Sequence, residues 1–317
     1  MKAAWIADAK AGDLSIRVGE IDAPAQAEDR LLIDVEAVGL TFAEPGWVTN
    51  GTTQGPDGTW RSLPVVIGHE FAGTVAHAGK DTHGFARGDR VVGLIDFWRD
   101  GAAATQASAL PSEVAALPDE VTSIEASTLP IGALTAWQAY FDHAKLVAGE
   151  TVLVHGGAGA VGTFAIQIAK GAGARVVTTA RGAEAVQLCL ELGADIAIDT
   201  ETQRFEDHAG EVDVVFDTVG HDLLERSWRF VRPRARLVTI SGEAEDAPSP
   251  DRAAGLGINA YWFIVRPDAA QLAEIARWVA DGRIKVQVDR LYPLEDATRA
   301  FAEAPGRRKK GKTVLTV

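Results

Sequence analysis

The pattern of hydrophobic and polar residues changes once along the chain, near residue 118. Before that point, short apolar runs at residues 30–38, 71–75 and 90–95 stand between glycine and proline residues, which is typical of strands joined by turns. After it, continuous Val- and Ile-rich runs alternate with helical patterns. The chain is therefore predicted to begin mainly-β and to continue as an α/β segment whose parallel sheet is covered on both faces.

The α/β segment and the residues after it have predicted elements of their own. A helical stretch at residues 123–142 leads into strands at 151–155, 175–179, 195–198, 212–216 and 236–240, with helices at 161–170, 183–192 and 223–230. A helix at 269–280, a strand at 286–292, a short helix at 294–303 and a strand at 312–317 follow. This tail is too small to fold alone, so we expect it to dock on the amino-terminal β domain.

Composition narrows the possible functions. The 317 residues are enough for two domains, and 47% hydrophobic with 24% charged residues is an ordinary globular balance. A net charge of −13 disfavours nucleic acid as a partner. Because Cys189 is the one cysteine, neither an intramolecular disulfide nor a multi-cysteine metal cluster can form. No signal peptide or membrane-spanning run is visible, so we expect a cytoplasmic protein with no membrane partner.

One glycine-rich turn stands where an α/β sheet would bind a nucleotide. Gly157-Ala-Gly159-Ala-Val-Gly162 follows a predicted strand and opens a predicted helix. Gly157 permits a tight turn, Gly159 lets the backbone approach a pyrophosphate, and Gly162 lets the helix pack against the strand. The helix, expected to begin near Gly159, would offer free N–H groups to the phosphates. The turn predicts a dinucleotide site, and a glycine turn without a ligand is the alternative.

The end of the next strand indicates which dinucleotide binds. An NAD site has an acid there that accepts hydrogen bonds from the ribose 2′-hydroxyl. Here the strand ends at Arg181, and the first acid after it is Glu184. Arg181 can bind a 2′-phosphate through charge-assisted bonds of about 1.5–3 kcal/mol, which favours NADPH over NADH roughly tenfold to hundredfold. A solvated arginine at a helix start is the alternative.

Several motifs occur in the order of a known superfamily: Gly68-His-Glu-Phe-Ala-Gly73, Leu134-Thr-Ala-Trp137, Glu191-Leu-Gly-Ala-Asp195, Val212-Asp-Val-Val-Phe-Asp-Thr-Val-Gly220 and Gly311-Lys-Thr-Val-Leu315. Nearly the whole chain resembles the medium-chain dehydrogenases/reductases, specifically their zinc-independent quinone oxidoreductase branch. The resemblance implies an α/β Rossmann domain with a doubly wound parallel sheet at 118–265, and a GroES-like mainly-β catalytic domain made of 1–117 and 266–317. It also implies NADPH-binding residues: Thr135, Gly157, Ala158, Gly159, Ala160, Val161, Gly162, Thr179, Arg181, Val219, Ser241, Gly242 and Lys312.

The zinc alcohol dehydrogenases of this superfamily raise the question of a metal. Their catalytic zinc takes a cysteine, a histidine and a further cysteine or acid, and the corresponding positions here are Thr41, His69 and Ile131. Neither threonine nor isoleucine is a useful zinc ligand, and one cysteine cannot build a four-cysteine structural site. We therefore predict no metal. His69 is interpreted as a hydrogen-bonded histidine beneath the active-site floor, with direct catalysis as the alternative.

Without a Lewis acid, hydride transfer from NADPH requires an acceptor that stabilises the resulting charge, such as a quinone or an α,β-unsaturated carbonyl. The protein must align this acceptor, exclude water and donate hydrogen bonds to its oxygen. By resemblance the candidate catalytic residues are Thr41, where the family often has Asn, Glu44, where it often has Asp, and Tyr261 as a proton donor or wall residue. A packing or capping role is the alternative for each.

The expected partners are a small apolar carbonyl or quinone and a second copy of the chain. Trp47, Trp60 and Trp98 lie in or beside loops that should border the cleft, and they would favour a flat acceptor. The apolar run at 258–265 is the candidate edge strand for a homodimer. Two alternative functions stay open, namely an enone or enal double-bond reductase and a catalytically inactive NADPH-binding sensor.

Overall fold

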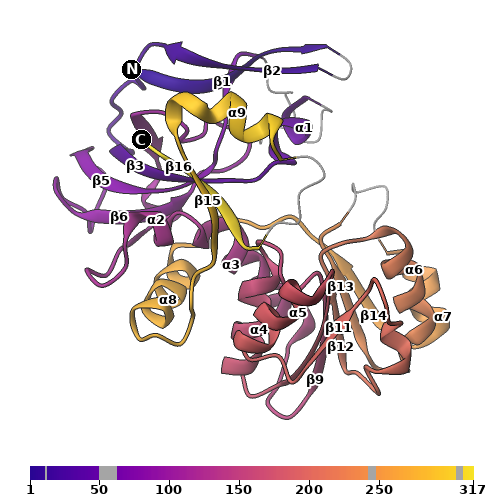
Figure 1. Ribbon diagram of the computed structural model, residues 1–317. Coiled ribbons are helices and arrows are strands. Elements are labelled where there is room, and N and C mark those ends of the chain that lie inside the picture. The colour runs from indigo at the N-terminus through magenta and orange to yellow at the C-terminus, as the bar shows by residue number, and fades with distance from the viewer. Residues whose placement is uncertain (11–12, 50–62, 242–247, 305–309) are drawn as a thin grey trace.

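The computed structural model describes residues 1–10, 13–49, 63–241, 248–304 and 310–317 (Figure 1). The described strands form a small sheet at the N-terminus, a larger mixed sheet and a parallel sheet. In Figure 1 the indigo, violet and yellow segments lie in one lobe, and the red and orange segments form most of the other. None of the described helices is both long and apolar enough to cross a membrane.

The mainly-β lobe joins the first and last parts of the chain. β16 (Lys312–Thr316) runs antiparallel to β3 (Leu31–Leu40) and parallel to β15 (Val288–Pro293), so the tail adds two strands to the amino-terminal sheet. This mixed sheet has the order β15-β16-β3-β5-β6-β8, and β7 also pairs with β3. The other strands of this lobe are β1 (Lys2–Lys10), β2 (Asp13–Glu20), β4 (Val65–Val66), β5 (Glu70–Ala78), β6 (Arg90–Leu94), β7 (Gln106–Ala109) and β8 (Val114–Ala116).

The parallel sheet has the order β11-β10-β9-β12-β13-β14. The five strands predicted in this region each lie within two residues of their expected bounds, and β14 lies within the run 258–265 that was expected to form an edge strand. The strands are β9 (Thr151–His155), β10 (Arg175–Ala180), β11 (Ile196–Asp199), β12 (Val214–Asp217), β13 (Arg236–Thr239) and β14 (Asn259–Trp262). Because the chain continues to β10 on one side of β9 and later to β12 on the other, the strand order reverses at β9. Ligands of such sheets bind outside the carboxyl ends of the strands at this reversal.

Both faces of the parallel sheet are buried. Val152 and Val154 of the central strand pack into one hydrophobic cluster, and Leu153 between them packs into another, which contains Trp228. This alternation of two buried faces explains the continuous apolar strands. The helices of this region are α4 (Gly162–Gly171), α5 (Ala183–Glu191), η3 (Phe205–Asp207), α6 (His221–Phe230) and α7 (Pro250–Leu256).

The single helix predicted at 123–142 is divided into three. Pro130 lies in the first turn of the second piece, where its missing N–H costs no hydrogen bond, and Lys145 ends the third in a left-handed conformation with φ of 52°. The pieces are α2 (Ser123–Ala126), α3 (Leu129–Trp137) and the π-helix η2 (Gln138–Ala144). The other helices are α1 (Glu44–Thr49), η1 (Pro111–Glu113), α8 (Ala269–Ala280), η5 (Leu294–Asp296) and α9 (Ala297–Ala302). The domain borders expected at 117/118 and 265/266 stay a prediction.

Candidate active site

The glycine-rich turn lies at the carboxyl end of β9. Gly157 N donates to the Thr179 carbonyl oxygen at 2.9 Å, which ties the turn to the end of β10. A Cβ on Gly162 would lie 2.1 Å from the Gly156 carbonyl oxygen, so only glycine lets α4 begin this close to the strand. A Cβ on Gly159 would meet that oxygen alone, at 3.2 Å, among the described atoms. The backbone at Gly159 is therefore open to a pyrophosphate, as a dinucleotide requires.

The helix after this turn begins one residue after the start of the predicted range 161–170, and later than the start also expected near Gly159. α4 begins at Gly162 and not near Gly159, and the first helical hydrogen bond runs from Thr163 N to the Gly159 carbonyl oxygen at 3.0 Å. Ala160 and Val161 are half-buried in the turn before the helix. The amides of this turn and of the first helical turn form the positive end of the helix dipole, which faces the strand reversal.

A buried polar network fixes the end of β9 beneath the turn. The His155 ring is fully buried, with Nδ1 3.1 Å from Thr179 Oγ1 and Nε2 2.8 Å from Ser227 Oγ. Burial lowers the pKa of His155 to about 4, so the ring is neutral near pH 7. Gly156 N also donates to Thr179 Oγ1, at 3.3 Å. Thr179, expected to contact the cofactor, thus directs its buried hydroxyl at protein groups under the turn.

Arg181 follows β10 at the same edge of the sheet. Its side chain is 73% exposed, and Nε lies 3.2 Å from Glu201 Oε1. Glu201 follows β11, the neighbouring strand, so the sheet supplies an acid that β10 itself lacks. The residues along β10 give no sign of this acid, because the pairing of β10 with β11, and not sequence proximity, brings it there.

The strands on the other side of β9 carry further expected cofactor residues. Asp217 Oδ1 accepts from Val219 N at 3.2 Å, and Asp217 Oδ2 accepts from Thr239 Oγ1 at 2.9 Å. The Thr239–Asp217 bond links the ends of β13 and β12, and Thr239 Oγ1 also accepts from Ser241 N at 3.2 Å. The Val219 side chain is 40% exposed beside them. Gly242 lies outside the described residues.

A second polar cluster lies where β3, β5 and β16 meet. Lys312 Nζ donates to Thr41 Oγ1 at 2.7 Å and forms an ion pair with Glu70 Oε1, and the Thr41 hydroxyl donates to the same carboxylate at 3.1 Å. Ile131 N donates to Glu70 Oε2 at 3.1 Å. Burial raises the pKa of Glu70, and the Lys312 ammonium opposes that shift. Glu70 and Lys312 are buried and Thr41 is half-buried, so Thr41 is the member that solvent reaches.

The Lys312 cluster joins the nucleotide turn directly. Gly311 N donates to the Ala158 carbonyl oxygen at 3.0 Å. Gly311 has φ of +87°, and a Cβ there would lie 2.1 Å from the Gln287 carbonyl oxygen, so the close pairing of this residue with the segment before β15 requires glycine. Thr135 is buried in α3, one turn after Ile131, whose amide holds Glu70.

Glu44 and His69 form a buried pair near this cluster. His69 Nδ1 lies 2.6 Å from Glu44 Oε1, which also accepts from Gly68 N at 2.6 Å, and His69 Nε2 lies 2.8 Å from the Arg99 carbonyl oxygen. Burial acts to raise the pKa of Glu44, but His69 and the Gly68 amide hold it below its ordinary value. The structure thus directs the Glu44 carboxylate at the backbone and at His69.

The other aromatic and catalytic candidates lie in different places. Tyr261 is on the edge strand β14, with its ring 5.7 Å from that of His143. Among the described residues it takes no part in the hydrogen-bonded cluster around Thr41. The Trp47 ring is 5.4 Å from Phe97, which in turn lies 5.4 Å from His69. Trp60 is outside the described residues, and Trp98 lines a separate cavity of about 570 Å³ near β4.

The residues at the zinc positions do not fit a zinc ion. Thr41 and Ile131 offer no suitable side-chain ligand, and both ring nitrogens of His69 are hydrogen-bonded to protein oxygens. Within the described ranges, no group of three His, Cys, Asp or Glu side chains could hold a metal. Cys189 is buried, and burial raises the pKa of its thiol to about 12, which suits a core residue.

Comparisons with known proteins agree with this architecture. Residues 27–119 match the alcohol dehydrogenase GroES-like domain family, and residues 192–315 match the family described as zinc-binding dehydrogenase. A probable zinc-binding mitochondrial oxidoreductase of Arthroderma benhamiae is 32% identical over 98% of this chain and 95% of its own.

Similar solved structures cover the whole chain, and two of them illustrate the likeness. The quinone oxidoreductase of Coxiella burnetii has a TM-score of 0.88 at 25% identity, over 100% of this chain and 99% of that one. A mycobacterial structure complexed with NADPH has a TM-score of 0.86 at 30% identity, over 100% of both chains. These likenesses confirm the predicted fold class, a GroES-like domain with a Rossmann-type parallel sheet.

Proposed function

The chain belongs to the medium-chain dehydrogenase/reductase superfamily, and we propose that it transfers hydride from NADPH to a quinone or a related conjugated carbonyl without using zinc. The main support for this proposal is the hydrogen bond of 3.0 Å from Gly311 N to the Ala158 carbonyl oxygen. It brings a turn suited to a dinucleotide next to Lys312, Thr41 and Glu70, which can hold and release a proton. The names of the Coxiella and mycobacterial neighbours support the acceptor and the cofactor.

The residues present fit NADPH, which when bound supplies the hydride. The open backbone at Gly159 and the amides before α4 would hold the pyrophosphate, and Arg181 would bind the 2′-phosphate. Lys312, adjoining the turn through Gly311, would lie beside the cofactor as the cation of the buried Lys312–Glu70 ion pair. Thr135, Val219, Ser241 and Gly242 remain proposed contacts.

Thr41 is the proposed proton donor. A quinone that accepts hydride becomes a hydroquinone monoanion, and this anion needs one proton. The Thr41 hydroxyl can turn its hydrogen from Glu70 Oε1 toward that anion while Lys312 Nζ still donates to Oγ1, which stabilises the developing charge. Lys312 or a protonated Glu70 then restores the hydrogen on Oγ1. Glu44 supports this site from below by holding His69 and Gly68 in place.

A panel of acceptors tests this function. Purified protein should oxidise NADPH with 9,10-phenanthrenequinone or a simple benzoquinone, and Thr41→Val should lower kcat about 10²-fold or more with little change in NADPH binding. Thr41→Ser keeps the hydroxyl and should retain most activity. Turnover of a medium-chain enal alone would show a double-bond reductase. Micromolar NADPH binding with no turnover of any acceptor would refute the enzyme and favour a sensor.

We also propose a cytoplasmic homodimer. β14 is an edge strand of the parallel sheet, and Ile264, just after it, is 54% exposed, so a second copy could pair along this edge. In that arrangement Tyr261 would lie near the dimer interface. Sedimentation at micromolar concentration should give the mass of two chains, and a monomer would contradict the pairing.

A further inference from the structure

We propose that Glu201 is a specificity-determining residue, whose carboxylate competes with the 2′-phosphate of NADPH for Arg181. The competition would lower the affinity for NADPH without changing the affinity for NADH, and so moderate the preference for NADPH. This inference rests on the proposed function, because it assumes that Arg181 binds the 2′-phosphate. It adds a residue from a different strand to the cofactor site.

The backbone holds the two residues of this pair in place. Arg181 Nε lies 3.2 Å from Glu201 Oε1, although 20 residues separate them in the chain. The Asp199 carboxylate oxygen Oδ1 accepts from Gly182 N at 2.9 Å and from Glu201 N at 3.0 Å. One carboxylate at the end of β11 therefore anchors the residue after Arg181 and the amide of Glu201 together. The backbone segments that carry Arg181 and Glu201 are therefore held next to each other through Asp199.

The neighbouring acid does not take this role. Glu184, in the first turn of α5, forms an ion pair with Lys310, which comes from the segment before β16. Glu184 is the first acid after Arg181 in the sequence, but the carboxylate beside the Arg181 guanidinium belongs to Glu201. In the tertiary structure Glu201 thus pairs with Arg181, and Glu184 pairs with Lys310.

The Arg181–Glu201 ion pair is weak enough that it lowers the affinity for NADPH without preventing NADPH from binding. Arg181 is 73% and Glu201 34% exposed, and opening an ion pair this exposed costs at most about fivefold in a binding constant. A phosphate that carries nearly two negative charges is a stronger partner for the guanidinium than one carboxylate. NADPH therefore displaces Glu201, with some loss of affinity, whereas the 2′-hydroxyl of NADH leaves the ion pair closed.

Glu201→Gln tests the competition, because it removes the charge and keeps the size of the side chain. We expect the Kd of NADPH, measured by fluorescence titration, to fall about two- to fivefold, and the Kd of NADH to stay within about twofold. Glu191→Gln is the matched control, since it removes one negative charge at the other end of α5 and should leave both values unchanged. In an Arg181→Ala background, most of the gain from Glu201→Gln should disappear.

These measurements distinguish a failure of the Glu201 competition from a failure of the NADPH assignment. If Glu201→Gln and Glu191→Gln change NADPH binding equally, or if the full gain persists without Arg181, the competition is wrong while the NADPH assignment stands. If Arg181→Ala instead weakens NADPH and NADH equally, Arg181 does not bind the 2′-phosphate. That result would overturn both the cofactor assignment and the role of Glu201.

Discussion

Arg181 stands at the end of β10, where an acid would select NADH, and its guanidinium can distinguish the two cofactors by charge. Replacing Arg181 with Ala should raise the KM for NADPH about tenfold or more, because a charge-assisted phosphate contact of about 1.5–3 kcal/mol is lost. The KM for NADH should change far less. Steady-state kinetics with both cofactors measures the difference, and an equal rise for both would contradict the assignment.

The sequence indicates which residues are candidates for catalysis, but not which groups they hydrogen-bond. The sequence identified Thr41 and Glu44 from their positions in the family pattern, and the structure shows what each hydrogen-bonds. Thr41 accepts a hydrogen bond from Lys312, 271 residues away, and Glu44 pairs with His69, 25 residues away. No local sequence pattern encodes partners this distant. The sequence therefore identifies Thr41 and Glu44 as candidates, but it does not show which groups donate to and accept from the Thr41 hydroxyl.

The strand–turn–helix unit from β9 to α4 is the element most fully encoded by local sequence. Gly162 allows close packing of α4 against the strand and Gly159 leaves space for a pyrophosphate, and an alanine substitution at each position distinguishes these roles. Gly162→Ala places a Cβ 2.1 Å from the Gly156 carbonyl oxygen, so α4 must shift, and we expect a loss of several kcal/mol in the free energy of unfolding. Gly159→Ala places its Cβ in open space apart from one contact at 3.2 Å, so the fold should persist.

The methyl group of Gly159→Ala would instead occupy the space that a pyrophosphate approaches. We expect its Tm to stay close to that of the unmodified protein while the Kd of NADPH rises at least about tenfold. Thermal melts and fluorescence titrations on both variants give the comparison. Normal NADPH binding by a well-folded Gly159→Ala protein would show that the turn does not cradle the cofactor.

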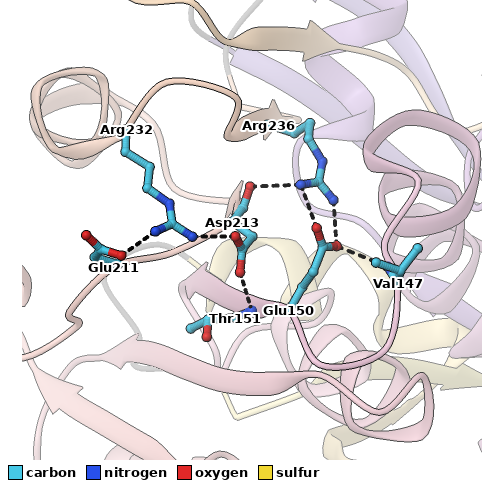
Figure 2. Close-up of polar contacts among 7 residues, drawn as sticks. All are labelled: Val147, Glu150, Thr151, Glu211, Asp213, Arg232 and Arg236. Carbon is cyan, nitrogen blue, oxygen red and sulfur yellow. Dashed lines mark hydrogen bonds and ion pairs between the residues drawn. The ribbon is translucent and has the colours of Figure 1, made fainter.

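At the scale of the whole molecule, the ion-pair network of Figure 2 lies at the amino-terminal ends of β9, β12 and β13, whereas the candidate site lies at their carboxyl ends. Arg236 at the start of β13 binds both oxygens of Glu150, at 2.8 and 2.6 Å, and its Nε donates to the Ala144 carbonyl oxygen at 2.8 Å. Asp213 accepts from Thr151 N at 2.8 Å, which joins β12 to β9. The network thus connects three strands and the end of η2.

Arg236→Met should destabilise the fold by about 2 kcal/mol, because it leaves the largely buried Glu150 carboxylate without its cation. Arg232→Met is the control, since Arg232 is 42% exposed and pairs with the exposed Glu211 and with Asp213, which keeps its bond from Thr151 N, and it should cost clearly less. Urea unfolding measures both values, and NADPH kinetics should be unchanged in both. Equal losses for the two variants would refute this ranking.

The amino-acid sequence by itself determined most of the alternation of strands and helices in the parallel-sheet region, the nucleotide turn and the basic residue after β10. These features depend on periodicity and on glycine or arginine at single positions, which local sequence expresses directly. The pattern predicted one helix over 123–142 and missed its division into three, although Pro130 is a local signal for one of the breaks. Only the tertiary structure decided that Lys312 reaches Thr41 and Glu70 and that Glu201 meets Arg181. Those contacts depend on strand pairing between distant segments, because β16 adds to β3 and β11 lies beside β10.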